Sequence, residues 1–188
     1  MKKGIYGYVD KKKIAEITKA LIMFFLAILI FIIGYLVNNK SKQNIFSVIS
    51  ILFTLPASRN LVGYIVLYRY HTPKLELYNE LIEITDESTI LYSDLAISSV
   101  EKTMYIDFMI ILANNIVLFT NNKNQDKNYI EKYLKGLLSS RNLNYKIYIY
   151  DDFNKFIEKI NLNKKSSIEH SKKDEIKIID SLIKSLII

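Results

Sequence analysis

The residues of this chain that could do chemistry are acidic side chains in places where acids are uncommon. Asp107 lies between Ile106 and Phe108 in the most hydrophobic strand-like segment, and Asp94 lies among apolar neighbours in the segment before it. A carboxylate in such a place needs compensating partners if it is buried, and perturbed acids of this kind gather at functional sites. Asp107 is therefore the best catalytic candidate and Asp94 the second. A structural role is the alternative for both.

A second acidic set lies on one expected helix. Glu76, Glu80 and Glu83 are spaced i, i+4 and i+7, so their carboxylates share a helix face. A metal-dependent hydrolase needs carboxylates that hold a divalent cation, which makes Asp107, Glu76 and Glu80 the candidate metal ligands. The alternative is an ordinary solvated helix face.

Other chemistries lack their residues. The chain has no cysteine, which excludes disulfides, thiol catalysis and cysteine metal sites. The only glycine after His71 is Gly136, so no glycine-rich loop is present to hold a phosphate or a dinucleotide. The two histidines, His71 and His170, lack metal-ligand spacing. We therefore expect no cofactor.

Two long apolar runs precede these residues. Ala20–Val37 contains no charge and would form a helix of about 27 Å, close to the ~30 Å core of a bilayer. A second run extends from Ile45 to Tyr68 and contains Arg59. These runs predict a two-helix transmembrane hairpin within residues 1–71, with spans at about 20–37 and 45–68. A cleaved signal peptide is the alternative for the first run, but no A-x-A-like site follows it.

The charge distribution sets the expected orientation and partners. Residues 1–71 hold ten Lys/Arg and two Asp/Glu, a net charge of +8, whereas the rest holds 16 and 17, a net charge of −1. By the positive-inside rule, the N-terminus and the C-terminal domain of this multi-pass cell-membrane protein are cytoplasmic. A nucleic-acid-binding domain would itself be basic, so the expected partners are the lipid bilayer and a protein partner or a second copy of the chain.

Four residues are expected at the inner membrane interface. Arg59, Arg69, Tyr64 and Tyr68 are of the types that anchor helices at headgroup level. A long arginine side chain reaches the headgroups from within a span, which makes Arg59 an interfacial anchor. The alternative is that Arg59 is an intramembrane charge for a substrate or partner.

Residues 72–160 predict a cytosolic α+β domain. Its elements follow the order α-β-β-β-α-β-α and form a mixed sheet covered by helices. The polar residues 161–174 predict a linker, and residues 175–188 an amphipathic helix that docks on the domain. The expected elements are a helix after Pro73, strands Ile90–Val100, Met104–Ala113 and Ile116–Thr120, a helix Tyr129–Leu138, a strand Tyr145–Tyr150 and a helix Asp152–Ile160.

This order of elements resembles the restriction-endonuclease-like fold and its nuclease-related (NERD) branch, which is often attached to membrane spans. Ile106-Asp107 followed by apolar residues is similar to the first half of that family's motif. Phe119-Thr120-Asn121 stands where the family has E-x-K, so the resemblance implies a fold that has lost catalysis.

The whole chain also resembles small two-span membrane proteins of low-GC Gram-positive bacteria. The matching segments are GYVDKKK (7–13), LPASRN (55–60) and LYSDLAISSVEK (91–102). Some members are labelled O-linked GlcNAc-transferase-like, but the chain has no feature of a nucleotide-sugar site. We therefore expect a non-enzymatic, membrane-anchored binding domain; a tethered metal-dependent nuclease-like hydrolase that uses Asp107 is the alternative.

Overall fold

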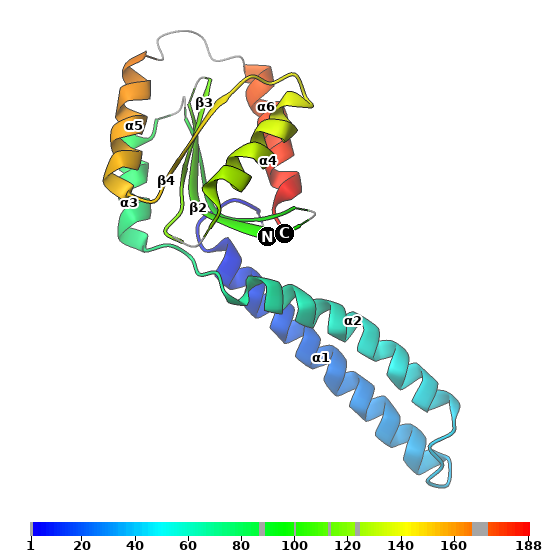
Figure 1. Cartoon of the computed structure of the whole chain (residues 1–188). Helices are drawn as coiled ribbons and strands as arrows, with labels where there is room; N and C mark the ends of the chain where they lie inside the picture. Colours follow the sequence, from blue (N-terminus) through cyan, green and yellow to red (C-terminus); the bar gives the residue numbers. More distant parts are fainter. Residues whose placement is uncertain (1, 87–88, 100, 113, 123–124, 167–172) are drawn as a thin grey trace. The chain divides into compact units, whose positions relative to one another are not determined.

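The structure is a computed structural model of the chain (Figure 1), and it describes residues 2–86, 89–99, 101–112, 114–122, 125–166 and 173–188. These residues form two compact units. One unit is Asp10–Arg69, and the other contains the residues up to Val9 together with those from Tyr70 onward. The N-terminal residues therefore group with the C-terminal domain, whereas the sequence placed all of residues 1–71 in the hairpin.

The Asp10–Arg69 unit is a pair of long helices, α1 (Tyr8–Val37) and α2 (Ile45–Tyr68). Both are long and apolar enough to cross a membrane, and little of either apolar stretch is buried. α1 begins twelve residues before Ala20, where ion pairs such as Lys13–Asp10 (2.7 Å) and Lys12–Glu16 (3.3 Å) support a polar first part of the helix.

Small side chains form the contact between α1 and α2. Ala20, Ala27 and Gly34 on α1 are buried, as are Ser50 and Ala57 on α2. The tightest point is at Gly34, where an added Cβ would lie 2.2 Å from the Cβ of Phe46. Inside a membrane, helices gain nothing from the hydrophobic effect when they associate. Small residues there allow the two backbones to approach closely and to pack against each other.

Gly34→Ala is accordingly expected to open the hairpin, because neither helix backbone can give way without losing the other contacts along the pair. A closed helical hairpin migrates faster than an opened one on an SDS gel, so the variant should migrate more slowly than the wild type. Leu36→Ala, at a position 65% exposed, is the matched control and should migrate as the wild type does. Equal migration of all three proteins would contradict the tight contact.

The second unit is an α+β domain with a four-stranded mixed sheet, which confirms the fold class expected from the sequence. Strand order is β1-β2-β3-β4; β1 and β3 pair antiparallel with β2, and β4 pairs parallel with β3. The elements are α3 (Leu75–Ile84), β1 (Ile90–Ser98), β2 (Thr103–Leu112), β3 (Asn115–Phe119), α4 (Lys127–Ser139), β4 (Lys146–Tyr150), α5 (Phe153–Ser166) and α6 (Lys173–Leu186).

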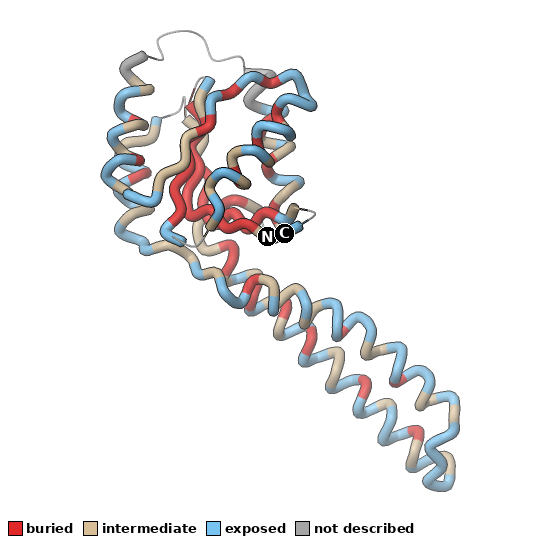
Figure 2. Tube along the Cα trace, in the orientation of Figure 1, coloured by how far each residue is buried: buried red, intermediate tan, exposed pale blue. Residues whose placement is uncertain are grey.

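Helices cover both faces of this sheet (Figure 1). Phe108, Ile110 and Leu112 of β2 point to the side of α3 and α5, where they form one core with Leu81 and Phe156. The alternate residues of β2 point to the side of α4 and α6. Figure 2 shows the result as a buried sheet between helices whose outer surfaces are exposed.

The C-terminal residues pack on the domain. Ile179, Ile183 and Ile187 are almost fully buried, and the Tyr92 hydroxyl donates a hydrogen bond to Asp180 of α6. The expected linker at 161–174 is shorter than the sequence suggested, because α5 continues through Ser166; residues 167–172 of that linker lie outside the described residues.

Residues from both ends of the chain lie along the free edge of β1. The Ser93 N–H donates to the Gly4 carbonyl (3.1 Å), and the Ile188 N–H donates to the Ala96 carbonyl (2.9 Å). Ile97 forms an isolated antiparallel bridge with Ile187. The edge of β1 is thus closed by segments that are remote from it in sequence.

Candidate functional site

Asp94, one of the two predicted catalytic acids, is completely buried in the middle of β1. Its carboxylate accepts hydrogen bonds from the Gly7 N–H (2.6 Å), the Thr72 hydroxyl (3.1 Å) and the Tyr105 hydroxyl (2.7 Å). These donors come from the N-terminal segment, the segment before α3, and β2. We call this arrangement of Asp94, Gly7, Thr72 and Tyr105 the Asp94 clasp.

The backbone of the clasp adopts a conformation that few residues accept. Asp94 has φ = 57° and Gly7 has φ = 80°, both in the left-handed region. Aspartate tolerates this region better than most side chains, and glycine has no Cβ to oppose it. Asp94 therefore holds three chain segments together from inside the fold.

Asp107, the other predicted acid, faces Asp94 across the β1–β2 ladder. The register pairs Ser93 with Phe108 and Leu95 with Ile106, which sets the two aspartates opposite each other. Asp107 is 6% exposed, and its Oδ2 accepts a hydrogen bond from the Asn121 N–H at 2.8 Å. Burial raises the pKa of Asp107 to about 6, helped by the nearby charge of Asp94 and opposed by the Asn121 hydrogen bond.

The candidate metal ligands are not brought together. Glu76 and Glu80 are exposed on α3, on the sheet face to which Phe108 points, whereas Asp107 alternates to the opposite face. Among the described residues, no group of three His, Cys, Asp or Glu side chains could hold a metal ion. Within the part of the chain that the structure describes, Asp107 therefore lies apart from Glu76 and Glu80.

The expected interfacial residues all lie at the C-terminal half of α2 or directly after it. Arg59 is exposed on the helix, and Arg69 is its C-cap residue. The rings of Tyr64 and Tyr68 lie 5.7 Å apart.

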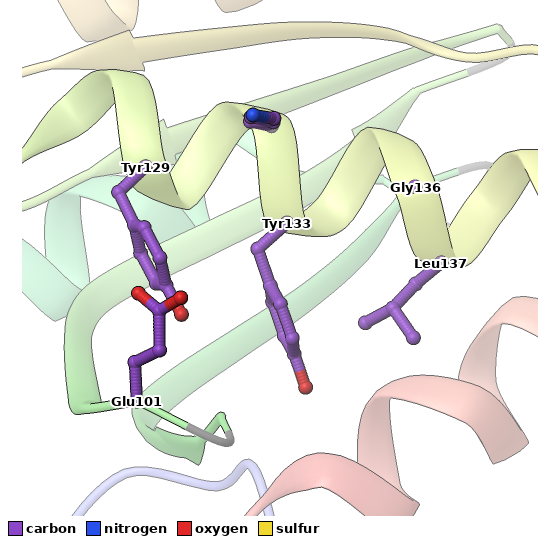
Figure 3. A pocket seen from close by; sticks show the side chains of 6 residues that line it. Glu101, Tyr129, Tyr133, Gly136 and Leu137 are labelled. Carbon is purple, nitrogen blue, oxygen red and sulfur yellow. The ribbon is translucent and has the colours of Figure 1, made fainter.

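A surface groove of about 530 Å³ runs along α4 (Figure 3). Glu101, from the β1–β2 turn, is below the ring of Tyr129 in this view, and the side chains of Tyr133 and Leu137 project from the helix on the same side. We call this surface the α4 groove; its lining residues are Glu101, Tyr129, Lys132, Tyr133, Gly136 and Leu137. The sequence predicted a helix at residues 129–138 but no groove along it.

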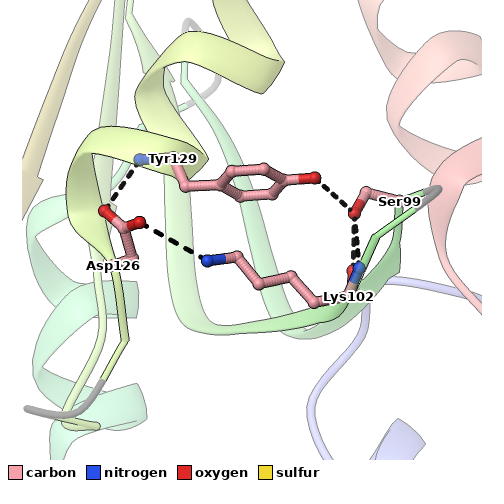
Figure 4. A network of polar contacts seen from close by, with 4 residues as sticks. All are labelled: Ser99, Lys102, Asp126 and Tyr129. Carbon is pink, nitrogen blue, oxygen red and sulfur yellow. Dashed lines mark hydrogen bonds and ion pairs between the residues drawn. The ribbon is translucent and has the colours of Figure 1, made fainter.

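Hydrogen bonds fix one wall of the α4 groove (Figure 4). The Tyr129 hydroxyl is 2.8 Å from Ser99 Oγ, and the Lys102 ammonium lies 4.1 Å from the centroid of the Tyr129 ring. The same ammonium is 3.4 Å from Asp126, whose carboxylate caps α4 by accepting from the Tyr129 N–H at 3.0 Å. That N–H bond lowers the pKa of Asp126. Both the ring and the backbone of Tyr129 are therefore held in place.

Tyr133 is held in a similar way. Its hydroxyl donates to the Ser98 carbonyl (3.3 Å), and its ring lies nearly parallel to that of Tyr129, with centroids 6.3 Å apart and an interplanar angle of 8°. Both hydroxyls are thus tied to Ser98 and Ser99, at the end of β1 and directly after it.

A second, smaller hollow of about 390 Å³ lies between α3 and α5. Glu80 and Glu158 line it together with two asparagines and the apolar Ile157 and Leu162.

Comparison with known proteins gives no match: no protein-family model matches the chain, and no curated protein or solved structure matches it either. The resemblance to restriction-endonuclease-like proteins is accordingly supported by none of these comparisons.

Proposed function

We propose that the protein is a membrane-anchored, non-enzymatic binding domain that holds a protein partner in the α4 groove. The observation that carries this proposal is the contrast between the buried aspartates of the sheet and the α4 groove on the surface. The two catalytic candidates, Asp94 and Asp107, are buried at the sheet, and Asp94 is engaged by three donors of its own chain. The α4 groove is open and its walls are fixed, and its volume lies in the range of ligand-binding clefts.

In this proposal α1 and α2 cross the cell membrane, and the α+β domain faces the cytoplasm. The apolar side chains exposed along both helices support the first point, because in water such surfaces would be costly. The excess of Lys and Arg before the first span supports the second. Arg59, exposed on α2, serves as an anchor at the inner headgroups.

Site-specific photo-crosslinking in cells tests the proposed binding surface. A photoreactive amino acid at Lys132 or Leu137 in the α4 groove should give one discrete adduct. The same amino acid at Lys155, exposed on α5 across the sheet, should give none. An adduct of twice the chain's mass would identify the partner as a second copy. No adduct at the groove, or equal adducts at all three positions, would overturn the proposal.

A tethered metal-dependent hydrolase that uses Asp107 is the competing function, and a calorimetric titration separates the two. We expect Mg²⁺ and Mn²⁺ to give no saturable heat with the full chain in detergent, because the described carboxylates do not converge on one point. The Asp107→Asn variant should give the same trace. Tight binding by the wild type that the variant loses would establish a metal site and reject the non-enzymatic function.

A further inference from the structure

We propose that the α4 groove binds a peptide segment in which a basic and an acidic side chain flank an apolar one. The inference rests on the proposed function and names the chemistry of the partner. The basic side chain pairs with Glu101, the acidic side chain pairs with Lys132, and the apolar side chain packs on Tyr133 and Leu137.

The charges of the groove support a partner with both signs. Glu101 and Lys132 are exposed, and among the described residues neither has an ion-pair partner. Elsewhere on α4 the surface charges are already paired: Lys135 with Glu131 at 2.6 Å, and Lys127 with Asp151 at 2.6 Å. The two unpaired charges of opposite sign therefore both fall on the groove, where a wholly basic or wholly acidic segment would be repelled by one of them.

The tyrosine and leucine side chains suit the apolar side chain of such a segment. The chain's own Lys102 ammonium already lies over the Tyr129 ring, so the apolar side chain of the segment packs further along α4. Tyr133 and Leu137 are half-buried and present apolar surface further along the helix. A partner segment thus meets a carboxylate, aromatic rings and an ammonium within one groove.

A glycine at position 136 is a second, independent observation in favour of a bound segment. Glycine inside a helix is less favourable than alanine, and here a Cβ would meet nothing within 4 Å, so the fold has no steric need for it. Gly136 lines the groove. A missing side chain at this place lets the backbone of a bound segment approach the helix closely.

The test uses the full chain in an uncharged maltoside detergent, with ¹³C-labelled tyrosine rings observed by NMR. The probes are acetyl-Ala-Lys-Leu-Glu-Ala-amide, the same peptide with Lys and Glu exchanged, and acetyl-Ala-Gln-Leu-Gln-Ala-amide. We expect one charged peptide to bind about four- to ninefold more tightly than the neutral one, since each exposed ion pair contributes about two- to threefold. The shifts should be confined to the signals of Tyr129 and Tyr133, assigned through Tyr→Phe variants.

Two variants of Gly136 separate binding from folding. Gly136→Ala should raise the melting temperature and weaken binding by about two- to threefold, because it improves the helix while its methyl group keeps the bound segment further from the backbone. Gly136→Gln also suits a helix but fills the groove, so it should abolish the shifts without loss of stability. Unchanged peptide binding by Gly136→Gln would overturn the proposal.

A double-mutant cycle assigns the charges. Glu101→Gln should weaken the tighter charged peptide but leave unchanged the same peptide with Gln in place of Lys, and Lys132→Gln should act in the same way on the acidic residue. Equal binding of charged and neutral peptides would reject this partner chemistry. The crosslink at Lys132 or Leu137 would still stand in that case, so failure of the peptide chemistry is distinguishable from failure of the proposed function.

Discussion

Replacing Asp94 with alanine is expected to destabilise the α+β domain by about 2–4 kcal/mol, because the part-buried Gly7 and Thr72 donors lose this acceptor, whereas the Tyr105 hydroxyl keeps the His71 carbonyl. The Gly7 N–H, the Thr72 hydroxyl and the Tyr105 hydroxyl all meet this carboxylate. Alanine also tolerates the left-handed backbone at φ = 57° less well than aspartate does. The N-terminal segment and the segment before α3 should loosen together.

Near-ultraviolet circular dichroism of the tyrosines during urea unfolding of the full chain in detergent measures this loss. Asp94→Asn is the matched variant, since asparagine also accepts the left-handed backbone and retains one acceptor oxygen. It should lose less than half as much stability. Asp86→Ala, which removes an exposed ion pair with Lys164, should change the stability by less than about 0.5 kcal/mol. A loss below about 1 kcal/mol for Asp94→Ala would contradict the clasp.

The Asp107→Asn variant is expected to be more stable than the wild type at neutral pH and not at pH 4. The pKa of Asp107 rises from 3.8 to about 6 on folding, so the folded state holds its proton more tightly than the unfolded state does. Its contribution to stability is complete below pH 4 and is lost as the pH rises through 6. The loss is about 3 kcal/mol for a shift of this size.

The difference between wild type and variant isolates this effect from the other acids that titrate in the same range. Urea unfolding at intervals from pH 4 to pH 7.5 should give a difference that grows in favour of the variant up to about pH 6–7 and then stays level. Asparagine can still accept the Asn121 hydrogen bond through its side-chain oxygen. Parallel stability curves for the two proteins would show that Asp107 is not perturbed.

Much of the fold follows from patterns that are local in the sequence. Two long apolar runs, the second of them containing Arg59, predicted two long helices, and the structure confirms helices of that length and composition. Alternating β-branched and aromatic residues predicted strands, and the domain has the expected mixed sheet. Composition was a poorer guide at 161–166, where polar residues suggested a linker. They continue α5 instead, and Lys164 forms an ion pair with Asp86 at 3.0 Å.

The Asp94 clasp and the α4 groove are formed by residues that are distant in the sequence, so no local sequence pattern predicts them. Asp94 stood out in the sequence because of its apolar neighbours, but its partner Gly7 is 87 residues away. Glu101 and Lys132 attract no attention as exposed charges, and they share a groove only because the β1–β2 turn lies beside α4. Gly136, a glycine within a predicted helix, was the one available signal, but in the sequence it indicated only that no glycine-rich phosphate-binding loop is present.

The closed edge of β1 makes assembly of this sheet depend on residues that lie on both sides of the two long helices in the sequence. The Gly4 carbonyl that accepts from Ser93 precedes both long apolar helices, and Ser93 follows them. Contacts across so many residues form late in folding, after the intervening chain has found its place. Until the Gly4 segment is in place, β1 presents unpaired backbone groups on which other chains could aggregate. A fragment that begins at Pro73 would lack this cover of the strand edge and both the Gly7 and the Thr72 donors of the clasp.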